Sequence, residues 1–533
     1  MSNWMEKLAR LIPVLALLAV LFGGLALTQS RLNRIRTDEN LTMATPLENA
    51  PPVVAFTTVA LGGFRGLLAD WLWLRSRRLQ DEGNYFEMVQ LGNWIVKLQP
   101  RFTGATAFLA WNMSYNISVT FSDFEDRWRW VRRGIELIRD EALQYNPGDP
   151  DLYYELAWIY RHKVGQKMDD ANRYYKTEMA RDIMRILGTY PPDWSAWQQT
   201  PDKIEDLRAD LPEAAPAWSV LDSMGMDLRD LETRFRADGE FPEELRAGVS
   251  DPAALQALER VLRKRWLHDE YKLEPTLIRT LNAAYGELDW RLPQAHAIYW
   301  AYQGLQRAEG EMHTDCERLI THALNQAFYE GRLLYVKEGN EEYLDLSPNI
   351  DVVDVTLERH RQNLLNYPDN SGFRAGFKNF LIDAVVVLYT YGEDKKAREL
   401  MDEGREQFGR EFRGSVERFA LRQLAKDIRE ATQAQAAATV RGYLFQACRS
   451  LAFGDYDRAG NFENLAHSIW RRYMADAADT ENQRKRRGLP PYSQMKQNTI
   501  DLCLKQFAPT LAARLKAAIG TLQGDEEQPT TTP

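Results

Sequence analysis

Aromatic and arginine side chains recur along three consecutive amphipathic segments, at spacings that would bring them to one surface. Aromatic rings supply rigid contact area, and a guanidinium offers a fork of donors that matches a carboxylate. Such a surface could bind an extended peptide or a terminal carboxylate. Counting along each segment from its small packing residue predicts these contacts: Trp73, Arg77, Trp111, Tyr115, Tyr154, Trp158 and Arg161. The alternative is that the aromatics pack between helices, because aromatic stripes at helical spacing usually belong to a core.

A second group of residues has the types that bind metal ions. His313 and Cys316 share one face of a predicted helix, and His322 follows nine residues after His313. All three could bind one ion only if the helix were broken, because ligand geometry is strict. We therefore interpret them as parts of a packed helix and predict neither a metal site nor a cofactor. His162 and His296 are likewise interpreted as structural.

The sequence contains no motif of a known catalytic type. It has no phosphate-binding loop, G-x-S-x-G elbow, H-E-x-x-H pair or dinucleotide fingerprint, so no catalytic residue is predicted. The run 127–133 interleaves arginine with tryptophan, as in proteins that bind single-stranded nucleic acid. On a helix, however, its arginines fall on the outer face, and the net charge of −9 argues against a general nucleic-acid binder. The basic run 484–487 is interpreted as a charged helix end.

The elements that must position the candidate contacts are short amphipathic helices in pairs. Two helices joined at Gly83 and ended by Pro100 have the pattern of a tetratricopeptide repeat, which cannot bury its apolar face alone. A second pair is predicted over 103–147, with a lengthened loop at 119–124 that could carry a partner contact. A third begins at Asp149, where an N-cap residue is followed by proline. Neighbouring pairs must therefore stack.

The predicted fold is all-α: a tetratricopeptide-like (TPR-like) α-solenoid of stacked helix pairs with one N-terminal transmembrane helix. Its parts are a cytoplasmic tip and transmembrane signal anchor (1–36), a linker (37–52), N-terminal repeats (53–190), an irregular or inserted helical segment (191–272), C-terminal repeats (273–519) and a disordered tail (520–533). The three cysteines, Cys316, Cys448 and Cys503, are far apart in the sequence and indicate buried apolar positions and no disulfide framework.

The membrane anchor is predicted from Leu11–Thr28, an uncharged run of 18 residues, which just spans a bilayer as a helix. A cleaved signal peptide is the competing interpretation, but Ala26 offers a poor cleavage site. Basic residues flank both ends, so they hardly decide the orientation. The short amino-terminal tail favours a single-pass protein of the bacterial inner membrane with most of the chain in the periplasm.

Several segments resemble a family of uncharacterised membrane-anchored bacterial proteins with tetratricopeptide-like repeats. They are Trp111–Val119, Arg127–Val131, Tyr145–Pro147, Glu155–Ile159 and Leu288–Ala301, and the resemblance extends over about 53–188 and 275–304. It implies little chemistry, since the family has no assigned activity. The wider repeat class implies a protein or peptide partner bound in a concave groove, which is an analogy from fold.

Three hypotheses for function follow. The leading one is a scaffold or adaptor that binds a protein or peptide partner at the bacterial cell envelope. The second is an enzyme, or an accessory subunit of envelope biosynthesis, with a site in 191–272 or in the loop near Phe121. The third is a subunit of a larger membrane assembly, with a flat apolar patch in place of a groove. A buried cluster of ionisable residues in one pocket would favour the second hypothesis, and an open groove lined by Trp and Arg the first.

Overall fold

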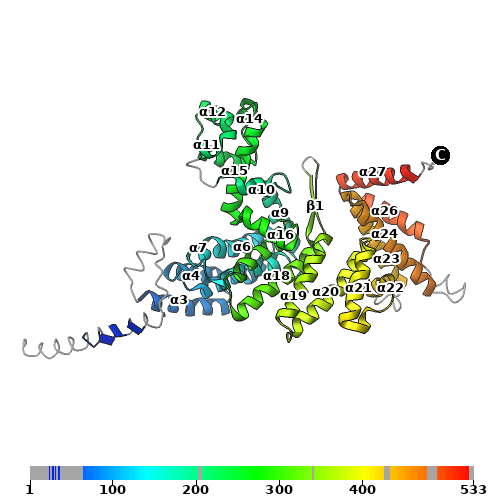
Figure 1. Ribbon diagram of the computed structural model, residues 1–533, viewed down its shortest axis with the longest axis horizontal. Helices are drawn as coiled ribbons and strands as arrows, with labels where there is room; N and C mark the ends of the chain where they lie inside the picture. Colours follow the sequence, from blue (N-terminus) through cyan, green and yellow to red (C-terminus); the bar gives the residue numbers. More distant parts are fainter. Residues whose placement is uncertain are drawn as a thin grey trace, which may run out of the picture. The chain divides into compact units, whose positions relative to one another are not determined.

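A computed structural model describes residues 64–201, 207–338, 341–424, 433–476 and 489–526, with a few positions between 23 and 35 (Figure 1). The chain divides into two units. One comprises 1–70 and 97–99, and the other comprises 71–96 and 100–533. The sites described below lie in the second unit. The predicted linker and nearly all of the predicted anchor, Leu11–Thr28, lie outside the described residues. Among the residues that are described, none of the helices has the length and apolar character needed to cross a bilayer.

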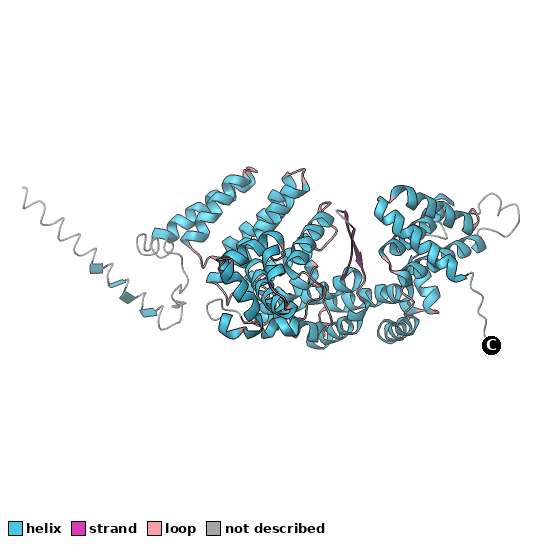
Figure 2. Ribbon diagram, turned by 90° about the horizontal axis from the view of Figure 1, so that it is seen from above, coloured by secondary structure: helices cyan, strands magenta, loops and turns pink. Residues whose placement is uncertain are grey.

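Most of the described chain is helical, with one pair of strands visible in Figure 2. The predicted all-α class is confirmed at this level. The first helix pair is α3 (Phe64–Asp81) with α4 (Tyr85–Leu98). In the second pair, the first helix is made of α5 (Thr103–Trp111), η1 (Asn112–Ile117) and η2 (Ser118–Thr120), and the second of α6 (Phe124–Glu136), η3 (Leu137–Ala142) and α7 (Leu143–Tyr145). In the third pair, α8 (Pro150–Trp158) and η4 (Ile159–Val164) are followed by α9 (Asn172–Leu187).

Local signals in the sequence explain where these helices begin and end. Gly83 adopts a φ of +72° between α3 and α4, a conformation that side chains disfavour. The Asp149 carboxylate accepts a hydrogen bond from the Asp151 N–H at 3.0 Å, and Pro150 occupies the first turn of α8. Asp123 caps α6 in the same way, accepting from the Glu125 N–H.

The second pair is held together by close packing at Gly134 of α6. A Cβ at this position would lie 2.7 Å from the carbonyl oxygen of Ala110 on α5 and would also meet the Ser114 hydroxyl. We predict that Gly134→Ala forces the helices apart and destabilises the protein by about 1–3 kcal/mol, as overpacking does. Urea denaturation followed by circular dichroism measures this.

Gly442 is the matched control for that substitution. It lies exposed within a helix, and a Cβ there would meet nothing within 4 Å. Gly442→Ala should leave stability unchanged or raise it by up to about 1 kcal/mol through helix propensity. Equal stability of the two variants would contradict close packing at Gly134.

The segment that follows α9 consists mainly of short helices, with one helix of 20 residues (Pro252–Tyr271), before the chain returns to the third pair. These are α10 (Trp194–Gln199), α11 (Leu207–Asp210), η5 (Pro212–Ala214), α12 (Ala215–Ser223), α13 (Leu228–Asp238), α14 (Glu243–Gly248), α15 (Pro252–Tyr271) and α16 (Pro275–Tyr285). The next helix, α17 (Pro293–Leu305), packs against α8 and η4 as well as against α18 (Gly310–Glu330). Helices separated by more than a hundred residues are therefore direct neighbours.

A β-hairpin interrupts the predicted C-terminal repeats, and the sequence analysis missed it. Strands β1 (Arg332–Glu338) and β2 (Glu341–Ser347) are antiparallel, with Tyr335 opposite Leu344. Leu333, Leu344 and Leu346 pack with Ala180 of α9 and with Leu292, the residue that precedes α17. Two strands alone are marginally stable, so this apolar contact with helices supports the hairpin.

The remaining described elements are η6 (Ile350–Val352), α19 (Val353–Asn366), α20 (Ser371–Thr390), α21 (Asp394–Phe408), η7 (Gly409–Phe412), α22 (Val416–Leu424), α23 (Gln433–Phe453), α24 (Tyr456–Asp476), α26 (Tyr492–Gln506) and α27 (Pro509–Glu526). The predicted disordered tail is thus wrong for residues 520–526, which continue α27. Its charged residues follow a Leu- and Ala-rich helical stretch that extends past the predicted boundary. Residues 527–533 lie outside the described part.

The three cysteines are free and buried on helices, as predicted. Two of them, Cys448 and Cys503, are nevertheless close together in the folded chain. The side chains of Cys448 on α23 and Cys503 on α26 share a small apolar cluster with Leu515.

Candidate functional site

Four of the predicted contact residues and one histidine form a continuous series of rings, here called the aromatic stack. Neighbouring ring centroids lie 5.4 Å apart for Trp111 and Tyr115, 5.7 Å for Tyr115 and His162, 4.6 Å for His162 and Trp158, and 6.2 Å for Trp158 and Tyr154. The Tyr115 hydroxyl is also 3.1 Å from Nδ1 of His162. Trp111 is 38 % exposed, so solvent reaches one end of the stack.

Arg161 lies beside the aromatic stack and is the unusual residue of the site. Its guanidinium carbon is 5.0 Å from the centroid of the Trp158 ring, a cation–π arrangement. The side chain is 8 % exposed, and its Nε is buried without a hydrogen-bond partner. No carboxylate forms an ion pair with it among the described residues. Burial lowers the pKa of Arg161, although Tyr154 and Tyr115 act in the opposite direction.

Two π-helical segments, η1 and η4, carry three of the side chains of this site. Tyr115 lies on η1, and Arg161 and His162 lie on η4. A π turn holds more residues than an α turn, so it rotates later side chains around the helix axis; such turns are frequent at functional sites. The position of Arg161 therefore depends on a backbone feature that counting at 3.6 residues per turn does not describe.

Trp73 and Arg77 do not join the aromatic stack. The Trp73 ring lies 5.6 Å from the centroid of Phe102 and 4.9 Å from that of Phe108. The Arg77 guanidinium lies 5.1 Å from the Phe108 ring. These two predicted contacts form a second cluster on α3 and α5, with the Arg77 side chain exposed.

Two neighbours of the predicted aromatic residues were absent from the predicted set. His162 was interpreted as structural, although its spacing of four from Trp158 and eight from Tyr154 places it in the stack. Burial lowers its pKa, and the adjacent Arg161 and Lys163 lower it further. Lys163 is 2 % exposed, and its ammonium nitrogen lies 5.4 Å from the Tyr115 ring centroid. No sequence signal distinguished Lys163 from a surface lysine.

The predicted metal-ligand candidates occupy one helix, α18, without converging. Cys316 is fully buried, and burial raises its pKa to about 12. Nδ1 of His313 is 3.3 Å from the Tyr367 hydroxyl, whereas His322 is exposed. Within the described ranges, no three His, Cys, Asp or Glu side chains are grouped so as to hold a metal ion.

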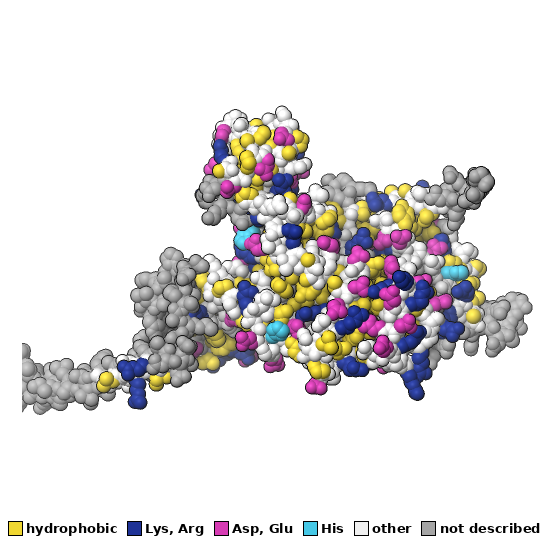
Figure 3. All heavy atoms as spheres, viewed as in Figure 1, with side chains coloured by type: hydrophobic (Ala, Val, Ile, Leu, Met, Phe, Trp, Pro, Cys, Tyr) yellow, Lys and Arg dark blue, Asp and Glu magenta, His cyan; other side chains and the backbone are white. Residues whose placement is uncertain are grey.

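The arginines of the run 127–133 are each balanced by carboxylates. Arg127 pairs with Asp169 and Asp170, Arg129 with Glu125 and Asp126, Arg132 with Glu136 and Glu270, and Arg133 with Glu141. On the face shown in Figure 3, Lys and Arg side chains are interspersed with Asp and Glu. A charge pattern of this kind presents no continuous basic track for a phosphate backbone.

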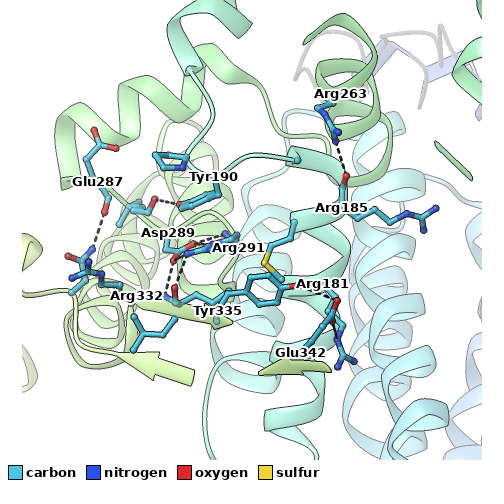
Figure 4. Close-up of a pocket in the computed structure, with 18 of the residues that line it drawn as sticks. Arg181, Arg185, Tyr190, Arg263, Glu287, Asp289, Arg291, Arg332, Tyr335 and Glu342 are labelled. Atoms are coloured by element: carbon cyan, nitrogen blue, oxygen red, sulfur yellow. Dashed lines mark hydrogen bonds and ion pairs between the residues drawn. The ribbon is translucent and has the colours of Figure 1, made fainter. Parts of the chain in front are cut away.

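A cavity of about 1360 Å³ lies elsewhere, among α9, the loop before α17 and the hairpin (Figure 4). Residues of the predicted inserted segment contribute to its wall, among them Gly239 and Arg263. Arg263 is 8 % exposed and donates to the carbonyl oxygens of Arg185 and Ile186 at 2.9 Å, at the C-terminal end of α9. That arrangement satisfies carbonyls that the helix end leaves free.

Several ionisable side chains in this cavity are paired with one another. Arg291 binds the Asp289 carboxylate through two hydrogen bonds of 2.8 and 2.7 Å, and its guanidinium carbon lies 3.9 Å from the Tyr190 ring centroid. Asp289 also accepts from the Leu333 N–H at 2.9 Å. Arg181 donates to Glu342 at 3.2 Å. These contacts tie the hairpin to the helices.

Comparisons with known proteins place no further constraint on the site. No protein-family model matches the chain, and no curated protein matches it.

Proposed function

We propose that the chain is a membrane-anchored helical-repeat scaffold that binds a carboxylate-bearing peptide segment of a partner protein at the aromatic stack. The observation that carries this proposal is Arg161. A buried cation without a carboxylate partner is costly, and protein interiors normally avoid it. A carboxylate from a partner would supply the missing charge and hydrogen bonds, while the rings of Trp158 and Tyr115 would hold the peptide chain.

The first test combines affinity with stability. The full chain, purified in detergent, is panned against random peptides with free carboxyl termini, and the peptides selected are resynthesised as amides and with Asp or Glu changed to Asn or Gln. Arg161→Gln should weaken binding of the carboxylate forms by about tenfold to a hundredfold, as expected for a lost hydrogen bond to a charged group. The same variant should be as stable as the wild type or more stable, because it removes an unpaired buried charge.

Arg77→Gln is the matched control, since Arg77 also lies over an aromatic ring but is exposed and outside the stack. It should bind like the wild type. If Arg161→Gln bound the peptides with unchanged affinity, or if the neutralised peptides bound as well as the originals, the carboxylate role of Arg161 would be wrong.

The finer architecture belongs to the same proposal. Helix pairs of α3 with α4, α5 with α6 and α8 with α9, and the packing of α17 on α8, support a TPR-like stack that resumes after an inserted segment. The uncharged run Leu11–Thr28 supports an inner-membrane anchor with the repeats in the periplasm. An alkaline phosphatase fusion at the carboxyl terminus, active only in the periplasm, tests the orientation.

The alternative, an enzyme or accessory subunit of envelope biosynthesis with a site in 191–272, has one observation in its favour. Residues of that segment line the cavity of about 1360 Å³. Its central charges, Asp289 and Arg291, are engaged with each other and with the hairpin backbone. This favours a structural role for the cavity wall over acid–base chemistry.

A further inference from the structure

A second cavity, of about 630 Å³, lies between the start of α9, the hairpin and the helices α23 and α24. We call it the basic cavity, because five basic side chains line it and only two acidic ones do. The basic residues are Lys167, Arg173, Lys176, Arg449 and Arg458, and the acidic ones are Glu330 and Asp345. Its volume is in the range of small-molecule sites, and leucine and aromatic side chains form part of its wall.

The two carboxylates do not neutralise the basic cavity. Glu330 forms ion pairs with Lys167 and with Lys176, the latter at 3.1 Å. Asp345 pairs with Arg449 at 2.7 Å. Arg173 is exposed and has no ion-pair partner among the described residues. The cavity therefore keeps an excess of positive charge.

Arg458 is the clearest sign that a ligand group is missing. It is 9 % exposed, yet its Nε is buried without a hydrogen-bond partner within the described part of the chain. The guanidinium makes one long hydrogen bond of 3.5 Å, to the Leu346 carbonyl oxygen. Its guanidinium is held over the Phe462 ring at 5.3 Å. Burial is the largest cause that lowers the pKa of Arg449. The nearby charges of Arg173 and Arg458 lower this pKa further.

The start of α9 adds backbone donors to these side chains. Asn172 and Arg173 form the first turn of α9 and line the cavity, and no side chain caps this helix. The first N–H groups of a helix, with the positive end of its dipole, favour bound phosphate. Guanidinium forks match phosphate oxygens in the same way.

We propose that the basic cavity binds the phosphate group of a phosphorylated organic molecule. An excess of about three positive charges suits a group carrying two negative charges better than a single carboxylate. The apolar wall, which includes Leu344 and Phe462, accommodates the organic body. This site is separate from the aromatic stack, so it extends the proposed function and does not depend on it.

The test is calorimetric titration of the full chain in detergent with inorganic pyrophosphate. Binding is expected, and it should weaken as salt is added. Arg458→Gln and Arg173→Gln should each lower the affinity by about threefold to tenfold or more. Arg332→Gln is the matched control: Arg332 is exposed and lines the larger cavity, not this one, so this variant should bind as the wild type does.

A second titration identifies the source of the phosphate. If vesicles of phosphatidic acid bind, phosphatidylcholine vesicles do not, and Arg173→Gln weakens the binding, the ligand is a lipid headgroup. If the chain binds pyrophosphate but not the vesicles, the ligand is a soluble phosphate. Absence of binding to both, or equal binding by wild type, Arg458→Gln and Arg173→Gln, would overturn the proposal. Arg458→Lys, which keeps the charge, controls for folding by circular dichroism.

Discussion

Asp169→Ala is expected to destabilise the protein by about 3–5 kcal/mol, the cost of breaking a buried ion pair by removing one partner. Asp169 accepts a charged hydrogen bond from Lys163, and further bonds from the Tyr175 hydroxyl at 3.1 Å and the Ala171 N–H at 2.9 Å. Lys163 and Asp169 are 2 % and 8 % exposed. The variant would leave an ammonium group buried without its counter-ion beneath the aromatic stack.

Burial raises the pKa of Asp169, but the hydrogen bonds from Lys163 and from Ala171 outweigh burial and lower it below its ordinary value. The contribution of Asp169 to the stability of the folded protein is therefore complete above the ordinary pKa of an aspartate, near 4. It is lost as the pH falls through the lower pKa that Asp169 has in the folded state. Urea denaturation at neutral pH measures the effect of the substitution.

The neighbouring Asp170→Ala is the control. Its side chain is 74 % exposed, and it pairs with Arg127, which also has Asp169 as a partner at 3.4 Å. Exposed ion pairs contribute about 0–1 kcal/mol, so this variant should differ little from the wild type. Equal effects of the two substitutions would show that the burial of Asp169 does not matter.

The second large effect is a loss of stability on mild acidification, caused by two buried histidines. His296 is 0 % exposed and His360 is 3 % exposed. Burial lowers the pKa of His296 to about 4 and that of His360 to about 3. In the unfolded chain a histidine has a pKa of about 6.5, so between these values the unfolded state binds more protons than the folded state.

The free energy of unfolding therefore has its full value above about pH 6.5. It falls as the pH drops toward 4, by about 3 kcal/mol for each histidine. Replacing both residues with glutamine, a neutral side chain of similar size, should flatten the dependence of unfolding free energy on pH over this range. Urea denaturation at a series of pH values measures the slope.

His268→Gln provides a control of opposite sign. A hydrogen bond from His268 to Glu274 raises the pKa of this exposed histidine. The small contribution of His268 to the stability of the folded state is therefore present in acid and is lost as the pH rises. The variant should keep the full acid sensitivity of the wild type. If the double variant also kept it, the buried histidines would not be its source.

Much of the local structure follows from residues close together in the sequence. Gly83 allows the left-handed turn between α3 and α4, and Asp149 with Pro150 begins α8. Apolar residues at helical spacing predict the buried faces of these helices, because burial is set by periodicity within one element. The aromatic spacing likewise predicted Tyr115, Tyr154 and Trp158, which the structure brings together.

The features that matter for function depend on contacts between distant segments. The basic cavity combines Arg173 with Arg449 and Arg458, which are more than 270 residues further along the chain. The hairpin that separates the cavities was missed because its short strands gain stability from α9 and α17, not from their own pattern.

The sequence by itself determined the helical class, the helix ends at Gly83 and Asp149 and the aromatic residues at regular spacing, because propensity, capping and periodicity act over a few residues. The tertiary structure alone decided that no carboxylate of the described residues pairs with Arg161 and that Lys163 pairs with Asp169. Whether a buried charge is paired depends on where another segment of the chain places its carboxylates, and π-helical turns such as η4 redirect side chains in ways that regular spacing cannot predict.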